Sequence, residues 1–328
     1  MRQDDHGNEF VVRDDMSEDE ARALTASLEA RGHKQSYWIE PLEPVEKRCA
    51  SVLSVQSFVS YGHVGNSAAA FALRRMGIDV WPVHTVALSS HLGHSGWGGR
   101  AIEPTHIEEI LGGLEALGAL GRADAVIFGF LGDVERARAA LSLLPKLSSQ
   151  ARVILDPVLG DHGVLYLPEE LVAFYRDHAL AHAHTLTPNI FELGLLSGLE
   201  ISSIEDVHAA VRVLFDEHPS LQQIVAKGFE VSESELELTA ATRDVTRSLR
   251  VARRARRFVG AGDLFAATLT AELVLQRGFF DAVALAASIT GEILAVTEEL
   301  GSDELALVAA QRCFDGVDLS AAVRWIEA

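Results

Sequence analysis

From residue 49 onward, short runs of β-branched and apolar residues alternate with longer segments in which apolar residues recur at helical spacing. The apolar runs predict strands at 52–56, 80–86, 125–128, 152–155, 185–186 and 223–226. The segments between them predict helices at 66–76, 107–117 and 134–144, and one that begins at Ile190. Buried strands that alternate with helices are typical of a mostly parallel sheet covered on both faces. The pattern therefore predicts an α/β fold.

The pattern changes in the last third of the chain. Residues 236–259 alternate between apolar and polar without a helical period, which predicts antiparallel strands. Two long helices are expected after them, at 264–276 and 281–298.

Residues 1–48 do not follow the strand and helix alternation. They are strongly acidic, with carboxylates at Asp4, Asp5, Glu9, Asp14, Asp15, Glu18, Asp19 and Glu20. Pro41 and Pro44 favour an extended connector. We therefore expect an acidic N-terminal extension at 1–48, partly helical or disordered, and a main domain at 49–328.

One helix is expected within the extension. Ser17 followed three residues later by Glu20 is a capping-box pattern. It predicts a helix at 18–31, with Gly32 as its C-terminal stop.

The composition limits the class of protein. The formal net charge is −19, which argues against nucleic acid or an anionic membrane surface as a partner. Cys49 and Cys313 are the only cysteines, so no disulfide framework or cysteine zinc site is expected. We also expect no membrane-spanning apolar stretch. The acidic N-terminus lacks the basic and then apolar regions of a signal peptide. The simplest location is the cytoplasm.

The turn formed by Gly260, Ala261, Gly262 and Asp263 carries the strongest chemical signal. Two glycines allow a tight turn and a close backbone approach to a ligand. The helix behind them leaves unpaired N–H groups and a partial positive charge, which favour an anion such as phosphate. An aspartate at this point fits a base that takes a proton from an alcohol during phosphoryl transfer. The alternative is an ordinary helix cap.

Other candidate residues follow the predicted strands, where α/β sheets bind their ligands. Asp156 and Asp161 follow the strand at 152–155 and suit a magnesium ion held together with phosphates, or simply a solvated turn.

Asn189 and Glu192 form a second capping-box pattern. Functionally, Glu192 could orient a metal-bound water and Asn189 could touch phosphate. Lys227, at the end of another strand, is a candidate phosphate ligand or a plain surface lysine.

The nucleotide-binding patterns most easily read from sequence are missing. Neither a Gly-x-Gly-x-x-Gly turn nor a P-loop occurs, so a nucleotide would need another design. The glycine-dense stretch 91–99 is expected to act as a lid. Its His91 and His94, with His84 nearby, are not expected to bind metal, because we find no matching cysteine or acidic ligands in the sequence.

Arginines cluster just before the glycine turn. They are Arg243, Arg247, Arg250, Arg253, Arg254, Arg256 and Arg257. A solvated strand face is the favoured interpretation, with one or two of them flanking ATP phosphates as the alternative.

Taken together, six segments in sequence order resemble the pyridoxal kinases of the ribokinase-like superfamily. They are Ser54-Val-Gln-Ser57 with Tyr61-Gly-His-Val-Gly-Asn-Ser67, Val80-Trp-Pro-Val83, Phe128-Gly-Phe-Leu-Gly132, Asp156-Pro-Val-Leu-Gly-Asp161, Thr187-Pro-Asn-Ile-Phe-Glu192 and Phe258-Val-Gly-Ala-Gly-Asp263. The resemblance covers about residues 50–315. It implies an α/β/α sandwich around a mostly parallel central sheet, in a homodimer.

The resemblance also implies a reaction, the ATP-dependent phosphorylation of the 5′-hydroxymethyl group of pyridoxal or a related B6 vitamer. Asp263 would be the base, and the amides of Gly260, Ala261 and Gly262 would form the anion hole. The substrate would contact Ser57, His91, Leu92 and Asp263. ATP would contact Asp156, Thr187, Asn189, Glu192 and Lys227. Mg²⁺ would lie near Asp156, Asp161 and Glu192, and a monovalent cation, K⁺ or Na⁺, is often present as well.

The glycine-dense loop departs from the family pattern, which usually reads Asn-His-Thr-x-Tyr. Here Ser90, Leu92 and His94 occupy the first, third and fifth positions, so the preferred vitamer stays open. Two alternatives also remain. One is a kinase of the same fold that acts on a hydroxymethylpyrimidine or a sugar. The other is a non-catalytic protein that binds pyridoxal phosphate or nucleotide.

Overall fold

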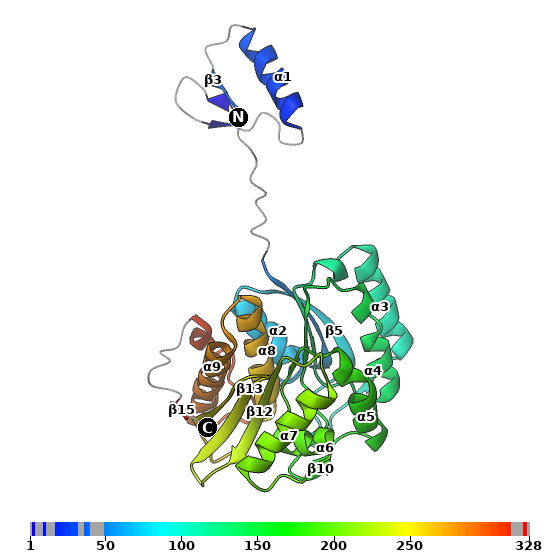
Figure 1. Cartoon of the computed structure of the whole chain (residues 1–328), viewed down its shortest axis with the longest axis vertical. Coiled ribbons are helices and arrows are strands. Elements are labelled where there is room, and N and C mark those ends of the chain that lie inside the picture. Colours follow the sequence, from blue (N-terminus) through cyan, green and yellow to red (C-terminus); the bar gives the residue numbers. More distant parts are fainter. Residues whose placement is uncertain are drawn as a thin grey trace. The chain divides into compact units, whose positions relative to one another are not determined.

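The computed structural model describes residues 2–3, 9–10, 17–31, 36–39, 49–315 and 324–326. Contacts along the chain divide it into two compact units, Met1–Arg48 and Cys49–Ala328. We describe each unit by itself (Figure 1).

The first unit contains one helix and three short strands. The helix α1 (Glu18–Glu29) begins at the predicted capping box, where Ser17 and Glu20 each bond the other's backbone N–H. The strands β1 (Arg2–Gln3), β2 (Glu9–Phe10) and β3 (Ser36–Tyr37) pair antiparallel in the order β2-β1-β3, and the sequence did not predict them. The predicted stop at Gly32 and the connector prolines, Pro41 and Pro44, lie outside the described residues.

The second unit is built on a large mixed sheet. Within the described part of the chain, its order is β15-β14-β13-β12-β11-β8-β7-β4-β5-β6. Its strands are β4 (Ser51–Val59), β5 (Asp79–Leu88), β6 (Gly99–Ala101), β7 (Ala125–Phe128), β8 (Arg152–Leu155), β11 (Thr185–Leu186), β12 (Gln223–Glu230), β13 (Glu235–Thr242), β14 (Thr246–Ala252) and β15 (Arg324–Ile326). A separate hairpin pairs β9 (Gly160–Asp161) with β10 (Val164–Leu165).

The predicted strand directions are confirmed. Strands β5, β4, β7, β8, β11 and β12 are parallel to one another. Strands β13 and β14 run antiparallel, as residues 236–259 predicted, and the short β6 and β15 add antiparallel edges. All the parallel strands therefore point their carboxyl ends to one edge, where a site is expected.

Helices cover both faces of this sheet. They are α2 (Asn66–Arg75), α3 (Pro104–Ala116), α4 (Val134–Leu141), α5 (Glu169–Phe174), α6 (Ile190–Ser197), α7 (Ile204–Glu217), α8 (Ala261–Val274) and α9 (Phe279–Glu299). Short helical turns occupy Leu120–Arg122, Leu144–Lys146, Tyr175–Ala179, Leu180–His182 and Gln311–Asp315. The sequence pattern did not predict α5 and α7 as separate helices.

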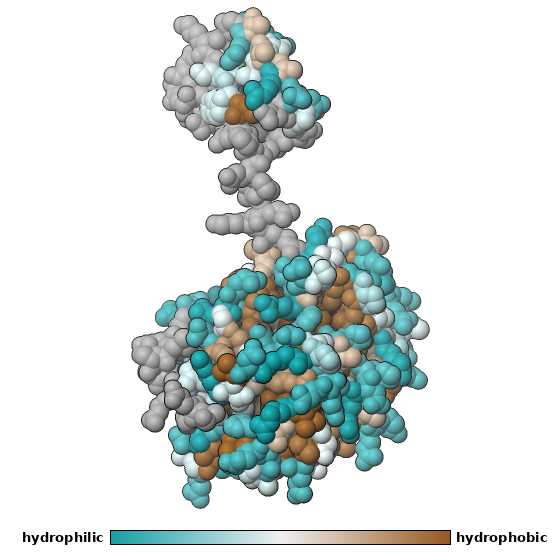
Figure 2. Space-filling view, viewed as in Figure 1, coloured by the Kyte–Doolittle hydropathy of each residue, from teal (hydrophilic) through white to brown (hydrophobic). Residues whose placement is uncertain are grey.

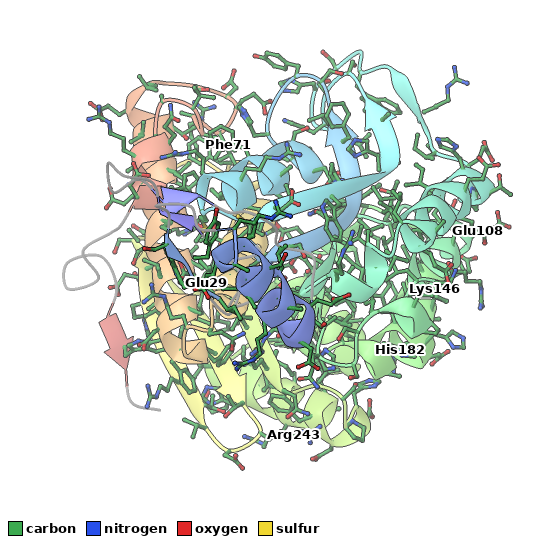
Figure 3. All side chains as sticks on the ribbon, turned by 90° about the horizontal axis from the view of Figure 1, so that it is seen from above. Glu29, Phe71, Glu108, Lys146, His182 and Arg243 are labelled. Atoms are coloured by element: carbon green, nitrogen blue, oxygen red, sulfur yellow. The ribbon has the colours of Figure 1, made fainter. Side chains whose placement is uncertain are left out.

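The two faces have separate cores because strand side chains alternate. Val126 and Phe128 of β7 pack with α3, α4, α5, α6 and α7, whereas Ala125 and Ile127 pack with α2, α8 and α9. Seen from above, Phe71 of α2 and Glu108 of α3 lie on opposite sides of the sheet (Figure 3). The predicted α/β/α sandwich is confirmed.

The helix α9 contradicts one expectation. It is long and apolar enough to cross a membrane by length and composition, with a mean hydropathy of 1.7. Such a helix is weak evidence for a membrane span, because core helices pass the same test. Here its apolar residues, such as Val283 and Ile289, lie in the two cores that α9 shares with α8. Half of its most apolar window of 18 residues is buried inside the fold.

The surface agrees with the composition. The face of the larger unit seen in Figure 2 is largely hydrophilic, with hydrophobic residues gathered in several small patches between the polar ones. Cys49 and Cys313 are both free.

Candidate active site

Two polar side chains from neighbouring strands converge on one carboxylate oxygen of a third residue, Asp156. Oδ1 of Asp156, just after β8, accepts hydrogen bonds from Thr187 Oγ1 at 2.6 Å and from Lys227 Nζ at 2.7 Å. Asp156 and Thr187 are buried, and the Lys227 side chain is only 16% exposed. The sheet thus brings together residues that lie far apart in the sequence, and it holds the ammonium group of Lys227 against Asp156.

The second predicted capping box is confirmed at the start of α6. Asn189 Oδ1 accepts from Glu192 N–H, and Glu192 Oε2 accepts from Asn189 N–H, both at 2.9 Å. The other Glu192 oxygen accepts from Leu159 N–H, so this carboxylate clamps the loop after β8. Burial, and then the charge of Asp156, raise the pKa of Glu192 to about 7.

Asp161 lies at the hairpin β9–β10 and makes different contacts. Its side chain is partly exposed and pairs with His162 at 3.2 Å and with Arg257 at 3.9 Å. In the part of the chain described, the structure does not join it to Asp156 by a direct contact. The intervening Val158 has a φ of 47°, an unusual value for a β-branched residue. Strain of this kind costs roughly 1–3 kcal/mol and is typical of functional loops.

The predicted glycine turn forms the start of α8. Gly260 has a φ of 90°, and a Cβ there would lie 2.0 Å from the carbonyl oxygen of His63. A side chain is therefore excluded by both conformation and space. The first-turn N–H groups lack helical acceptors, although Ala261 N–H donates at 3.3 Å to a carbonyl of the preceding turn. Lys227 Nζ lies 3.6 Å from the position a Gly262 Cβ would take, so its charge adjoins this turn.

Asp263 is the last residue of this turn and lies in the first turn of α8. Its pKa is raised to about 6, chiefly by burial and secondly by the charge of Asp156. A hydrogen bond from Gly65 N–H and the charge of Lys227 oppose the rise. Ser57 is close as well, because a Cβ on Gly65 would lie 2.2 Å from its hydroxyl. Gly65 is a contact that the sequence reading missed, since its amide gave no signal of its partner.

The glycine-dense loop is closed at its base. Ser89 N–H donates to Gly98 O at 2.7 Å, and Gly98 N–H donates to Ser89 Oγ at 2.8 Å. We call residues 89–99 the flap. Leu92, predicted to contact substrate, is 51% exposed, whereas Ser90 is buried.

The expectation that the flap histidines lack an acidic partner is wrong. Nε2 of His91 and Nε2 of His94 lie 3.0 and 2.6 Å from the same oxygen of Glu304. These three side chains form a group whose ligand atoms lie within 4.8 Å of one another. The sequence gave no sign of Glu304, which lies 210 residues from His94.

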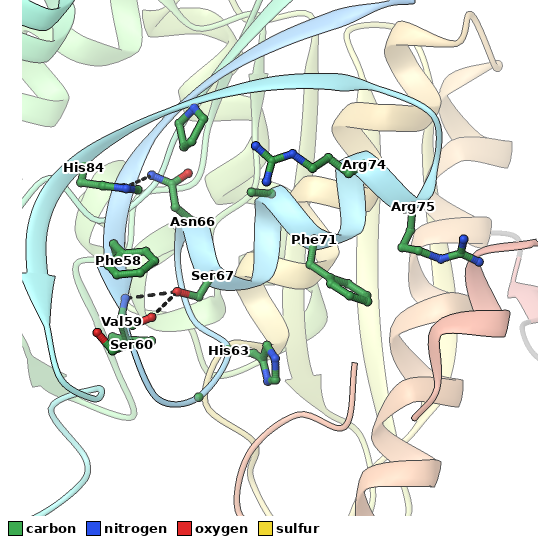
Figure 4. A pocket seen from close by; sticks show the side chains of 13 residues that line it. Phe58, Val59, Ser60, His63, Asn66, Ser67, Phe71, Arg74, Arg75 and His84 are labelled. Carbon is green, nitrogen blue, oxygen red and sulfur yellow. Dashed lines mark hydrogen bonds between the residues drawn. The ribbon is translucent and has the colours of Figure 1, made fainter. Parts of the chain in front are cut away.

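His84 lies elsewhere, at a separate cavity beside α2. This cavity has a volume of about 560 Å³. There His84 Nδ1 is 3.0 Å from Asn66 Nδ2, and its ring packs on Phe58 (Figure 4). Among the described residues, the lining includes none of the predicted site residues. His84 is therefore not part of the flap group.

The clustered arginines are largely committed to structural contacts. Arg243 donates to three backbone carbonyls, and Arg247 lies over the Phe280 ring at 4.4 Å. The other five form ion pairs with acidic side chains. Of the seven, Arg257 is the one that pairs with a predicted site residue, Asp161.

Known proteins share this sequence pattern. The model of the phosphomethylpyrimidine kinase family matches residues 96–307, more than half of the chain. Pyridoxal kinase PdxY of Rubrobacter xylanophilus is 36% identical over 267 residues, which is 80% of this chain and 92% of that protein. The PdxY of Pseudomonas putida is 34% identical over 273 residues, which is 81% of this chain and 94% of that protein.

Solved structures share the fold. Pyridoxal kinase from Leishmania donovani in complex with ADP and pyridoxamine superimposes with a TM-score of 0.77 at 29% identity. The match covers 84% of this chain and 98% of that one. From its sequence relatives and its fold, this chain belongs to the pyridoxal kinases of the ribokinase-like superfamily.

Proposed function

We propose that this protein transfers the γ-phosphoryl group of ATP to the 5′-hydroxyl group of pyridoxal or a related B6 vitamer. The observation that carries the proposal is Asp263, a carboxylate with a raised pKa at the positive end of α8 and next to Lys227. An anion site with a base beside it is what phosphoryl transfer to an alcohol needs. The pyridoxal kinase relatives support this substrate class.

In this reaction Asp263 takes the proton from the 5′-hydroxyl group. The substrate oxygen forms a bond to the γ-phosphorus, and the bond from phosphorus to the departing ADP oxygen breaks. The amides of Gly260, Ala261 and Gly262 bind the negative charge on the transferred group. Lys227 adds a formal positive charge beside the same turn.

The ATP phosphates and Mg²⁺ are assigned to the strand ends. Both hydrogen bonds to Asp156 reach Oδ1, which leaves Oδ2 as a ligand of the kind that Mg²⁺ prefers. Asp156, Asp161 and Glu192 would hold this ion, which neutralises phosphate charge when bound. Thr187, Asn189 and Lys227 would complete the nucleotide side, and Asp161 and Thr187 would lie near a monovalent cation, K⁺ or Na⁺.

We assign the vitamer to the region around Asp263. Ser57 would hydrogen-bond the pyridine ring, and the flap residues His91 and Leu92 would cover it. We further propose a cytoplasmic homodimer that binds neither nucleic acid nor membrane. The net charge of −19 supports the absence of polyanionic partners.

The decisive experiment is a coupled assay of ATP consumption with pyridoxal, pyridoxine, pyridoxamine and hydroxymethylpyrimidine. We expect turnover with at least one B6 vitamer and a much lower kcat/KM with the pyrimidine. A preference for the pyrimidine would instead indicate a pyrimidine kinase, in line with the name of the matching family model. Binding of a vitamer without any ATP consumption would instead identify a non-catalytic binding protein.

A further inference from the structure

The segment that follows α9 reaches the flap through one side chain. We propose that Glu304 is a positioning residue that holds the flap closed and ties it to the turn beside Asp263. The proposal concerns the conformation of the flap, and its catalytic consequence rests on the proposed function.

Glu304 is buried and accepts three hydrogen bonds from two segments. Its Oε1 faces Nε2 of both His91 and His94, at 3.0 and 2.6 Å. Its Oε2 accepts from the backbone N–H of His63 at 3.2 Å. The carboxylate therefore bridges two segments. One of its oxygens contacts the flap, and the other contacts the turn that precedes α2.

The hydrogen-bond pattern also determines where the protons lie. Gly93 N–H donates to Nδ1 of His91 at 3.1 Å, so this nitrogen is unprotonated and Nε2 carries the proton. A metal ligand would need the reverse, with a free Nε2 and a proton on Nδ1 facing an acceptor. This contact favours His91 as a hydrogen-bond donor to Glu304, and we therefore treat the group as a hydrogen-bonded clamp, although its residue types would suit zinc.

The bridged turn leads directly to the predicted anion hole. Gly62 has a φ of 93°, and a Cβ there would lie 2.1 Å from Glu304 Oε2. The carbonyl oxygen of His63 lies against Gly260, and Gly65 N–H bonds Asp263. The backbone of residues 62–65 thus connects Glu304, and with it the flap, to both the anion hole and the base.

This placement gives His94 a role of its own. It occupies the flap position where the family pattern has tyrosine, and its ring lies 4.3 Å from the ring of His91. A closed flap excludes water from a phosphoryl-transfer site. We therefore expect a loosened clamp to allow hydrolysis of ATP at the expense of transfer to the vitamer.

The first test is hydrogen exchange of the full-length protein, measured by mass spectrometry on Glu304→Gln. Glutamine replaces one of the two acceptor oxygens by an NH₂ donor, so its two terminal atoms cannot accept from both the flap and His63. Amides of residues 89–99 should exchange roughly tenfold faster or more, with exchange in α8 and α9 unchanged. Asp303→Asn is the matched control. Asp303 is next to Glu304 in the sequence, but its side chain is exposed and pairs with Arg256.

The second test measures coupling, as ATP hydrolysed without vitamer relative to vitamer phosphorylated. Glu304→Gln and His94→Leu should raise this ratio about tenfold, whereas His94→Gln, which keeps a donor near the Nε2 position, should stay close to wild type.

Several results would overturn the proposal. Unchanged flap exchange in Glu304→Gln would remove the clamp, and uniformly faster exchange with a lower Tm would reduce Glu304 to a structural role. Stoichiometric Zn²⁺ binding by the wild type that Glu304→Gln abolishes would identify a metal site instead. If the wild type phosphorylates no vitamer, the proposed function fails, while the exchange experiment still decides the clamp.

Discussion

Asp263 experiences opposing influences that together set its proton affinity. Burial and the charge of Asp156 raise its pKa, whereas Gly65 N–H and Lys227 lower it, and the result is about 6. Such a carboxylate is mostly ionised at pH 7 yet is a stronger base than an exposed aspartate, as general-base catalysis requires. The surroundings of one residue thus support the proposed chemistry.

Replacing Asp263 by Asn should abolish turnover while leaving ATP affinity largely intact. The amide keeps the shape and can still accept from Gly65 N–H, but it cannot take a proton. General-base contributions are roughly 10²–10⁴ in rate. Steady-state kinetics and nucleotide titration of the variant measure the two effects, with the Tm as a control for folding. Turnover near the wild-type rate would exclude Asp263 as the base.

The pH dependence of kcat/KM should show an acidic limb near pH 6. A base works only when unprotonated, so activity falls as the pH drops through its raised pKa. Lys227→Met should move this limb to higher pH, because Lys227 lowers the pKa of Asp263. The pH profiles of both proteins provide the measurement. A limb near pH 4, or one that Lys227→Met shifts downward, would contradict this assignment.

Replacing Leu92 by Thr should lower the KM for pyridoxal with little change in kcat. Leu92 is 51% exposed and stands where the family pattern has a threonine hydroxyl. One regained hydrogen bond is worth about 0.5–1.5 kcal/mol, a few-fold to about tenfold in affinity. The contact is remote from the transferred group, so the effect belongs to binding. An unchanged or higher KM would indicate that Leu92 serves as an apolar cover for another ring.

At the scale of elements, the start of α8 depends on backbone that only glycine can supply. The His63 carbonyl oxygen occupies the space of a Gly260 side chain, while α8 behind the turn is almost entirely buried. The packed helix fixes the direction of its first N–H groups, and the glycine lets a neighbouring turn approach them. The anion site is thus a consequence of how two elements meet.

Gly260→Ala should therefore lower both stability and activity. The left-handed conformation alone costs about 1–2 kcal/mol for a non-glycine residue, and the contact with His63 O adds to it. Gly291→Ala in α9 is the matched control, because no atom lies within 4 Å of its Cβ position. That control should be neutral or more stable by about 0.5–1 kcal/mol. Equal effects of both substitutions on Tm and kcat would refute the steric argument.

At the scale of the whole molecule, the second unit contains the entire candidate site. Its sheet is covered on both faces, and every proposed site residue lies between Ser57 and Glu304. The sequence match to pyridoxal kinase PdxY of Rubrobacter xylanophilus covers 80% of the chain. The core of this unit is therefore expected to form without residues 1–48.

Deleting residues 1–48 should leave a folded and active kinase, with kcat/KM within about twofold of the full chain and a similar Tm. Kinetics and thermal unfolding of the truncated protein test this, with the full-length protein as reference. Insolubility, or loss of most activity, would show that the first unit stabilises the second.

Much of this protein follows from local spacing in the sequence. The strand and helix alternation predicted the sandwich, because buried strands and amphipathic helices have distinct periods. Ser17 with Glu20 and Asn189 with Glu192 predicted their helix starts, since a cap and its partner lie within one turn. The short helix α5, the edge strands and the strands of the first unit escaped prediction, because such short segments are held by their neighbours more than by their own pattern.

The tertiary structure alone decided which distant side chains meet and what surrounds them. Lys227 lies 71 residues from Asp156, and Glu304 lies 210 residues from His94, so no local pattern could pair them. The pKa of Asp263 likewise depends on burial and on charges from other strands. The local sequence determined which helices and strands form and which chemical groups they carry. Packing determined the partners of those groups, because contacts between distant segments arise only when the sheet assembles.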